Sequence, residues 1–182
     1  MTKTGKGAMK VDGFVVQGAL PLSGKMRSTI PVEAMREPAD YVKTLAVSHL
    51  GEFEEGDELS GALAFFMSKN GQSLEAALGI IGALGHRPAI ASETEFLLHD
   101  RDSQAEVFKL AFQHAKRRRL DTQQVSGITK VFLPVFGTNY TIADVRLTPA
   151  LILHRQVGRD GYELVTIGGV HPGWLIPIVQ AT

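Results

Sequence analysis

The hydrophobic pattern of this chain changes near Gly127. Before this residue, segments with the two-residue period of strands alternate with segments of helical periodicity, whereas beyond it strand patterns follow one another without a helix between them. This order favours an α+β domain. We therefore predict a flexible N-terminal segment over residues 1–10 and a single α+β domain over residues 11–182.

The expected sheet is mixed or mainly antiparallel, with about three helices packed on one face and a β-meander at the C-terminal end. The predicted strands cover residues 11–20, 62–67, 89–98, 131–135, 140–147, 150–157 and 162–167. The predicted helices start near Pro31 or Pro38 and run to His49, from the N-cap Ser73 to Gly85, and over residues 102–119. Gly158 to Gly161 is the strongest turn signal and predicts a hairpin between the last two strands.

Composition excludes several classes of function. The chain has 182 residues and no cysteine, which rules out disulfides, thiol catalysis and thiolate metal sites. Nineteen basic residues balance nineteen acidic ones, so that only a local patch can attract a charged partner. The N-terminus has no signal-like apolar core, and the longest apolar-rich stretch, residues 59–84, is interrupted by polar residues. These features indicate a cytoplasmic, soluble protein.

The predicted helix over residues 102–119 carries the clearest charge cluster. Ser103 and Glu106 have the spacing of a capping box at its start. Helical projection places Val107, Phe108, Leu110, Ala111, Phe112 and Ala115 on one apolar arc, and Lys109, Gln113, Lys116 and Arg117 on the opposite arc with Glu106.

Arg118 and Arg119 project back over the apolar side of this helix. Burying them there unpaired would carry a large desolvation penalty. The helix therefore either stops near Arg117 or extends beyond the core and presents these two arginines to a partner. The simpler interpretation is that the run from Lys116 to Arg119 interacts with the helix dipole, and the functional one is that it binds phosphates.

Other features are less specific. The acidic segment over residues 52–58 does not have the residue spacing of a calcium-binding loop. It predicts a solvated turn or a surface for a basic partner. Residues 18–25 lack the spacing of a nucleotide-binding loop, and the histidines lack metal-site spacing. Trp174, between Pro172 and Pro177, either covers the open end of the core or anchors a partner. We therefore predict neither a metal site nor a cofactor site.

These observations favour a non-catalytic binding or assembly subunit of a larger complex over an enzyme. Its candidate binding residues are Lys109, Lys116, Arg117, Arg118, Arg119 and Trp174. The basic helix end would contact a nucleic-acid backbone or an acidic protein surface, and self-association is a further expectation. One alternative is a purely structural assembly component. Another is a small enzyme whose acids and histidines, among them Glu93, Glu95, His99, Asp144 and His154, converge in one pocket.

Overall fold

The computed structural model describes residues 12–27, 29–31, 44–47, 54–117, 130–134, 136, 138–139, 141–142, 145–146, 148–154 and 161–182. The helices within these ranges are α1 (Leu74–Ala83), α2 (Ala91–Thr94), the 3-10 helix η1 (Glu95–Leu98) and α3 (Arg101–Arg117). The strands are β1 (Gly13–Pro21), β2 (Thr29–Pro31), β3 (Thr44–Val47), β4 (Ala62–Ser68), β5 (Gln72–Ser73), β6 (His86–Pro88), β7 (Lys130–Pro134), β8 (Thr138–Asn139), β9 (Thr141–Ile142), β10 (Val145–Arg146), β11 (Thr148–His154), β12 (Gly161–Ile167), β13 (Gly169–Val170) and β14 (Leu175–Gln180). This set of elements confirms the α+β class.

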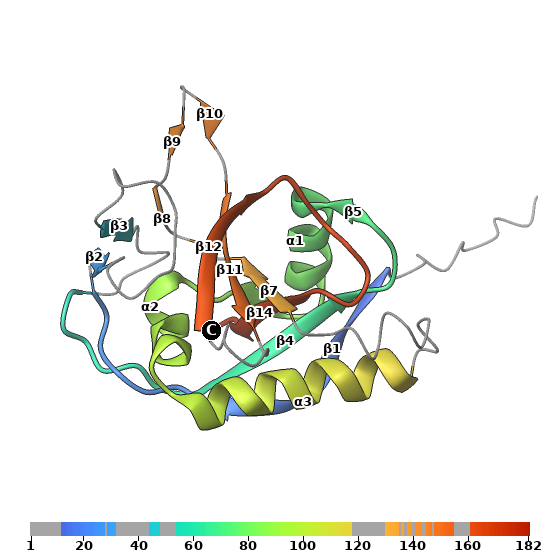
Figure 1. The fold of residues 1–182 in the computed structure, drawn as a ribbon, viewed down its shortest axis with the longest axis horizontal. Coiled ribbons are helices and arrows are strands. Elements are labelled where there is room, and N and C mark those ends of the chain that lie inside the picture. Colours follow the sequence, from blue (N-terminus) through green and yellow to red (C-terminus); the bar gives the residue numbers. More distant parts are fainter. Residues whose placement is uncertain are drawn as a thin grey trace, which may run out of the picture.

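A four-stranded antiparallel sheet in the order β1-β4-β14-β6 forms the centre of the molecule (Figure 1). A three-stranded antiparallel sheet in the order β12-β11-β7 contributes Val131, Leu133 and Leu153 to the same core. The pairing of β11 with β12 confirms the predicted hairpin, although its turn lies outside the described residues. The C-terminal meander is interrupted, because short strands separate β7 from β11 and β14 returns to the central sheet.

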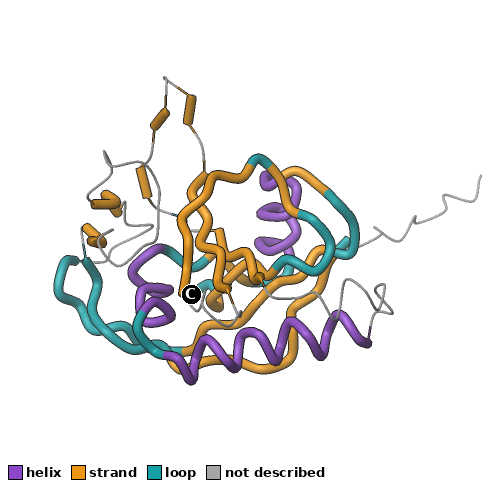
Figure 2. The backbone as a smooth tube through the Cα atoms, in the orientation of Figure 1, coloured by secondary structure: helices purple, strands orange, loops and turns teal. Residues whose placement is uncertain are grey.

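The two long helices cover opposite faces of the central sheet, with strands between them (Figures 1 and 2). On one face, Phe65 and Met67 of β4 pack in a cluster with Val107 and Phe108 of α3. On the other face, Phe66 packs in a cluster with residues of α1 that include Ile81. Placing the helices on one face was therefore wrong. The reason is that β4 carries large apolar residues at consecutive positions, so both of its faces require cover.

The first strand, β1, bends where α3 crosses it. Its pairing with β4 shifts register between Val16 and Leu20, and Gly18 in this interval has a φ of 110°. A Cβ atom at Gly18 would lie 2.7 Å from the side chain of Leu110 in α3. Glycine therefore permits both the backbone conformation and the close approach of the helix.

Helix α1 begins and ends as its sequence predicts. The Ser73 hydroxyl accepts a hydrogen bond from the Ala76 backbone N–H at 3.1 Å, as expected of an N-cap. Gly85 follows the helix with a φ of 77°, a conformation that glycine adopts without strain. Ala77 and Ile81 are buried on the side that faces the sheet.

Three predicted elements were wrong. Residues 91–98, expected as a strand, form α2 and η1. Thr44–Val47, placed in a helix, is the middle strand of a small antiparallel sheet with β2 and β8. The strand expected over residues 140–147 contains the separate strands β9 and β10, which pair with each other. The strand–helix errors arise because short apolar segments satisfy both periodicities, and tertiary pairing decides between them.

The capping box predicted at Ser103 and Glu106 was also wrong. Helix α3 begins at Arg101, and Asp100 accepts hydrogen bonds from the Asp102 backbone N–H at 3.0 Å and from the Ser103 hydroxyl at 2.6 Å. These two bonds lower the pKa of Asp100 from its ordinary value of 3.8, and the interaction with Ser103 is the main cause. The start of α3 is therefore stabilised by an aspartate one turn before the expected pair.

Among the helices that the structure describes, none is both long enough and apolar enough to cross a membrane.

Candidate functional site

The outer face of α3 presents a row of basic, aromatic and amide side chains. Lys109, Phe112, Gln113 and Lys116 follow the spacing i, i+3, i+4 and i+7, so they share one side of the helix, and all four are exposed. The ring of Phe112 is 45% exposed, whereas Phe108, one turn earlier, is 5% exposed. We call these four residues the α3 stripe. The prediction that Phe112 lies on the buried arc was wrong.

The geometry of α3 explains the position of Phe112. The buried residues of the helix centre on Val107, Ala111 and His114, and Phe112 falls at the margin of that arc at about 100° per residue. His114 occupies the middle of the arc, where its ring packs near Phe14 with centroids 5.5 Å apart. Because His114 is a buried residue, the buried arc is centred away from Phe112, which helical projection alone places with the apolar residues.

The ion pair between Lys109 of the α3 stripe and Glu106 is weak. Lys109 Nζ lies 3.2 Å from Glu106 Oε2, and both side chains are well exposed. Exposed pairs at this spacing stabilise by only about 0.3–0.5 kcal/mol, because water competes for both charges. The ammonium group of Lys109 can therefore exchange Glu106 for a stronger anion.

The basic run over residues 116–119 begins on this face, at Lys116. Lys116 is exposed, and α3 ends at Arg117, whose side chain lies outside the part that the structure describes. Arg118 and Arg119 lie outside the described residues altogether. Their role as phosphate-binding residues stays a prediction from the sequence.

Trp174 lies against the core. Its indole stacks on the ring of Phe132, with centroids 4.0 Å apart and planes 14° apart, and His171 packs edge-on at 4.8 Å. Trp174 also packs against the cluster on the α1 side of the sheet. This arrangement fits a residue that covers the end of the core better than a protruding anchor.

The acidic residues considered for catalysis have separate surroundings. Glu93 is buried and accepts hydrogen bonds from the Arg87 guanidinium at 2.8 and 2.9 Å and from the Ile90 backbone N–H at 3.0 Å. This carboxylate has a structural role, because it joins β6 to the start of α2. Asp144 and the side chain of His154 lie outside the described residues.

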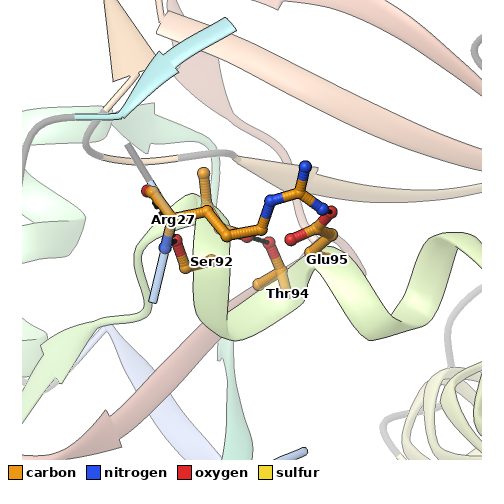
Figure 3. Close-up of polar contacts among 5 residues, drawn as sticks. Arg27, Ser92, Thr94 and Glu95 are labelled. Carbon is orange, nitrogen blue, oxygen red and sulfur yellow. Dashed lines mark hydrogen bonds and ion pairs between the residues drawn. The ribbon is translucent and has the colours of Figure 1, made fainter. Parts of the chain in front are cut away.

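Glu95 and His99 line an open groove beside the segment over residues 23–27. Figure 3 shows Arg27 extended along α2, with its backbone at Ser92 and its guanidinium at Glu95. The Ser92 hydroxyl accepts from the Arg27 N–H and donates to the Arg27 carbonyl, both at 3.1 Å. Arg27 Nη1 lies 2.7 Å from Glu95 Oε1. No local pattern in the sequence predicts this contact, since Arg27 and Glu95 are 68 positions apart.

Within the described residues, no three histidine or acidic side chains come together as ligands for a metal ion. The described part of the acidic segment forms an exposed turn, in which the Glu54 backbone N–H donates to Asp57 at 2.9 Å.

Comparisons with known proteins returned no similarity: no family model matches the chain, and no curated protein or solved structure matches it.

Proposed function

We propose that this protein is a non-catalytic binding subunit that contacts the phosphate backbone of single-stranded nucleic acid through the α3 stripe and the basic run that follows it. The observation that carries the proposal is the exposed ring of Phe112 between Lys109 and Lys116 on one side of α3. Lysines attract phosphates, and an exposed aromatic ring offers a surface on which a base can stack.

The surroundings of the α3 stripe support this partner class. The opposite side of α3 is fixed against the sheet by Val107, Phe108, Leu110 and Ala111, so the outer face is presented on a rigid element. The chain is neutral overall, and binding would therefore depend on this local charge cluster. The acidic protein surface considered as an alternative partner would use the lysines but would not require an exposed phenylalanine.

Fluorescence anisotropy with labelled single-stranded RNA and DNA of about one dozen nucleotides, a length within the range that such surfaces contact, tests the proposal. We expect binding that weakens steeply as salt is added. Phe112→Ala should weaken it about tenfold, because stacking on one aromatic ring contributes about 1–3 kcal/mol per base. The Lys109→Gln, Lys116→Gln double variant should reduce the slope of log affinity against log salt by about 1.4.

The matched control is Arg101→Gln, which removes an exposed cation at the other end of the same helix and should leave affinity nearly unchanged. The Arg117→Ala, Arg118→Ala, Arg119→Ala variant should flatten the salt dependence further. Unchanged binding by this triple variant would eliminate the contribution of the basic run. Binding to a poly-glutamate peptide but to neither nucleic acid would replace the proposal with an acidic protein partner.

A further inference from the structure

A groove near the start of α3 lies apart from the α3 stripe. One wall is formed by residues 23–27, which follow β1, and the other by residues 92–100, which include most of α2 and η1. Its volume is about 680 Å³, within the range of about 300–1,000 Å³ that is usual for sites of small molecules. Ser92, Glu95, Phe96 and His99 have the spacing i, i+3, i+4 and i+7, so one side of this helical stretch faces the groove.

Both walls are held in place by hydrogen bonds. Met26 is fully buried, its backbone N–H donates to the Asp57 carbonyl at 2.8 Å, and its carbonyl accepts from the Gly56 N–H at 2.8 Å. The next residue, Arg27, is bonded through both of its backbone groups to the hydroxyl of Ser92. The groove is therefore preformed, and a ligand would not have to order its walls.

The acidic groups of the groove are already engaged. Glu95 accepts from Arg27, and Asp100 accepts from the first turn of α3. The Lys25 ammonium and the His99 imidazole line the groove without a side-chain partner among the described residues. Arg27 is 46% exposed, and its planar guanidinium has five N–H donors, of which Glu95 takes one. The groove therefore has donors on Lys25 and Arg27 that are free of side-chain acceptors among the described residues, whereas its two carboxylates already accept hydrogen bonds.

Phe96 supplies the apolar part of the groove. Its side chain is partly buried and packs against the main core cluster, which fixes its position. We propose that this groove binds a small organic anion, in which a phosphate or carboxylate meets Lys25, Arg27 and His99 while an attached ring or apolar group rests on Phe96. This proposal does not depend on nucleic-acid binding by the α3 stripe, because the nearest residue of the stripe, Lys109, lies about 14 Å along the helix from Asp100 and does not line the groove.

The test is a titration of the ¹⁵N-labelled full chain with phenyl phosphate and, separately, with benzoate, followed by NMR. Phenyl phosphate or benzoate should shift the backbone amide signals of Lys25, Arg27, Phe96 and His99 in a saturable manner. The probe that binds more tightly identifies whether the anionic group is a phosphate or a carboxylate. Methyl phosphate, which lacks the ring, should bind about tenfold more weakly than phenyl phosphate, because it cannot cover Phe96.

Lys25→Gln should weaken binding of the better probe about fivefold, and Phe96→Leu should weaken binding of both ring-bearing probes. Lys69→Gln is the matched control, since Lys69 is exposed and does not line the groove. The proposal is overturned if neither probe shifts these amides at concentrations up to about 10 mM, tenfold above a millimolar dissociation constant. It is equally overturned if Lys25→Gln and Lys69→Gln, both folded by NMR, bind alike.

Discussion

The helical stretch over residues 91–98 and the longer helix α3 use charged residues in opposite ways. In the first, Glu93 pairs with Arg87 and Glu95 pairs with Arg27, so its acids connect the stretch to other elements. In α3, Lys116 forms no ion pair with another residue that the structure describes, and Lys109 pairs with Glu106 of the same helix. Charge joins parts of the fold in one region and remains available on the surface of the other.

The two regions also differ in how far their side chains are buried. From Ala91 to Thr94 every residue is buried, including the polar ones. In α3, by contrast, a large aromatic side chain lies on the outer face. Because a short stretch between two packed elements has little free surface, its polar groups must find internal partners, whereas a long helix at the edge of the fold keeps a solvent face. A surface for an extended partner such as nucleic acid is therefore easier to place on α3 than on residues 91–98.

The largest expected effect concerns the two phenylalanines of α3. Phe108→Ala removes a ring that is 5% exposed in the core and should lower the free energy of unfolding by about 3–5 kcal/mol. Phe112→Ala removes a ring that is 45% exposed and should lower it by less than about 1 kcal/mol. Urea denaturation followed by circular dichroism measures both. Similar losses would mean that Phe112 has a core role, and the α3 stripe would then lose its central residue.

An intermediate effect is expected for the two glutamates of the 91–98 stretch. Glu93 is 4% exposed, and Glu93→Gln should lower the free energy of unfolding by about 2–3 kcal/mol, because the neutral amide pairs poorly with Arg87. Glu95 pairs with Arg27, which is 46% exposed. Glu95→Gln should therefore lower the free energy of unfolding by less than about 1 kcal/mol. The same denaturation assay compares them. A larger loss of unfolding free energy for Glu95→Gln than for Glu93→Gln would contradict the structural role given to the buried pair of Arg87 and Glu93.

The smallest expected effect is the pH dependence of Asp100, which lies between residues 91–98 and α3. Its pKa is lowered mainly by donation from Ser103, so the folded state favours the carboxylate. The resulting stabilisation of the start of α3 is fully present above the ordinary pKa of 3.8 and is lost as the pH falls through the lower folded value. The carboxyl carbon of Asp100 should titrate by NMR with a midpoint below 3.8. In Asp100→Asn, the amide signals of the first turn of α3 should no longer change as the pH passes through this midpoint. A midpoint above 3.8 for the Asp100 carboxyl of the wild-type protein would contradict its role as the cap of α3.

The elements predicted correctly are those whose signals are local. Strand β4, helix α1 with its Ser73 cap and the hairpin of β11 with β12 each follow from residues within a short window. Residues 90–98 contained a helical signal as well, since the buried residues of this segment include Ile90, Ala91, Thr94, Leu97 and Leu98. These positions have helical spacing, but the alternation of Thr94, Phe96 and Leu98 fits a strand equally well. In the folded protein these residues are helical, and Glu93 and Glu95 pair with Arg87 and Arg27.

The candidate site likewise contains features that the local sequence predicts and features that depend on tertiary packing. Lys109 and Lys116 could be assigned to one side of α3 by periodicity alone, because that side is defined by neighbours along the helix. The exposure of Phe112 could not, since it depends on how α3 is rotated against β1 and on the burial of His114. The groove at Lys25, Arg27 and His99 had no sequence signal, because segments far apart in the chain form its two walls.

The sequence by itself determined the α+β class, the cysteine-free composition, the amphipathic character of α3 and the local caps and turns of α1. These properties arise from interactions between residues a few positions apart. Only the tertiary structure decided that α1 and α3 cover opposite faces of the sheet, that Glu93 is buried, and that Arg27 meets Glu95. Such outcomes depend on which distant segments share the limited area of one sheet, and no local pattern of residues encodes that competition.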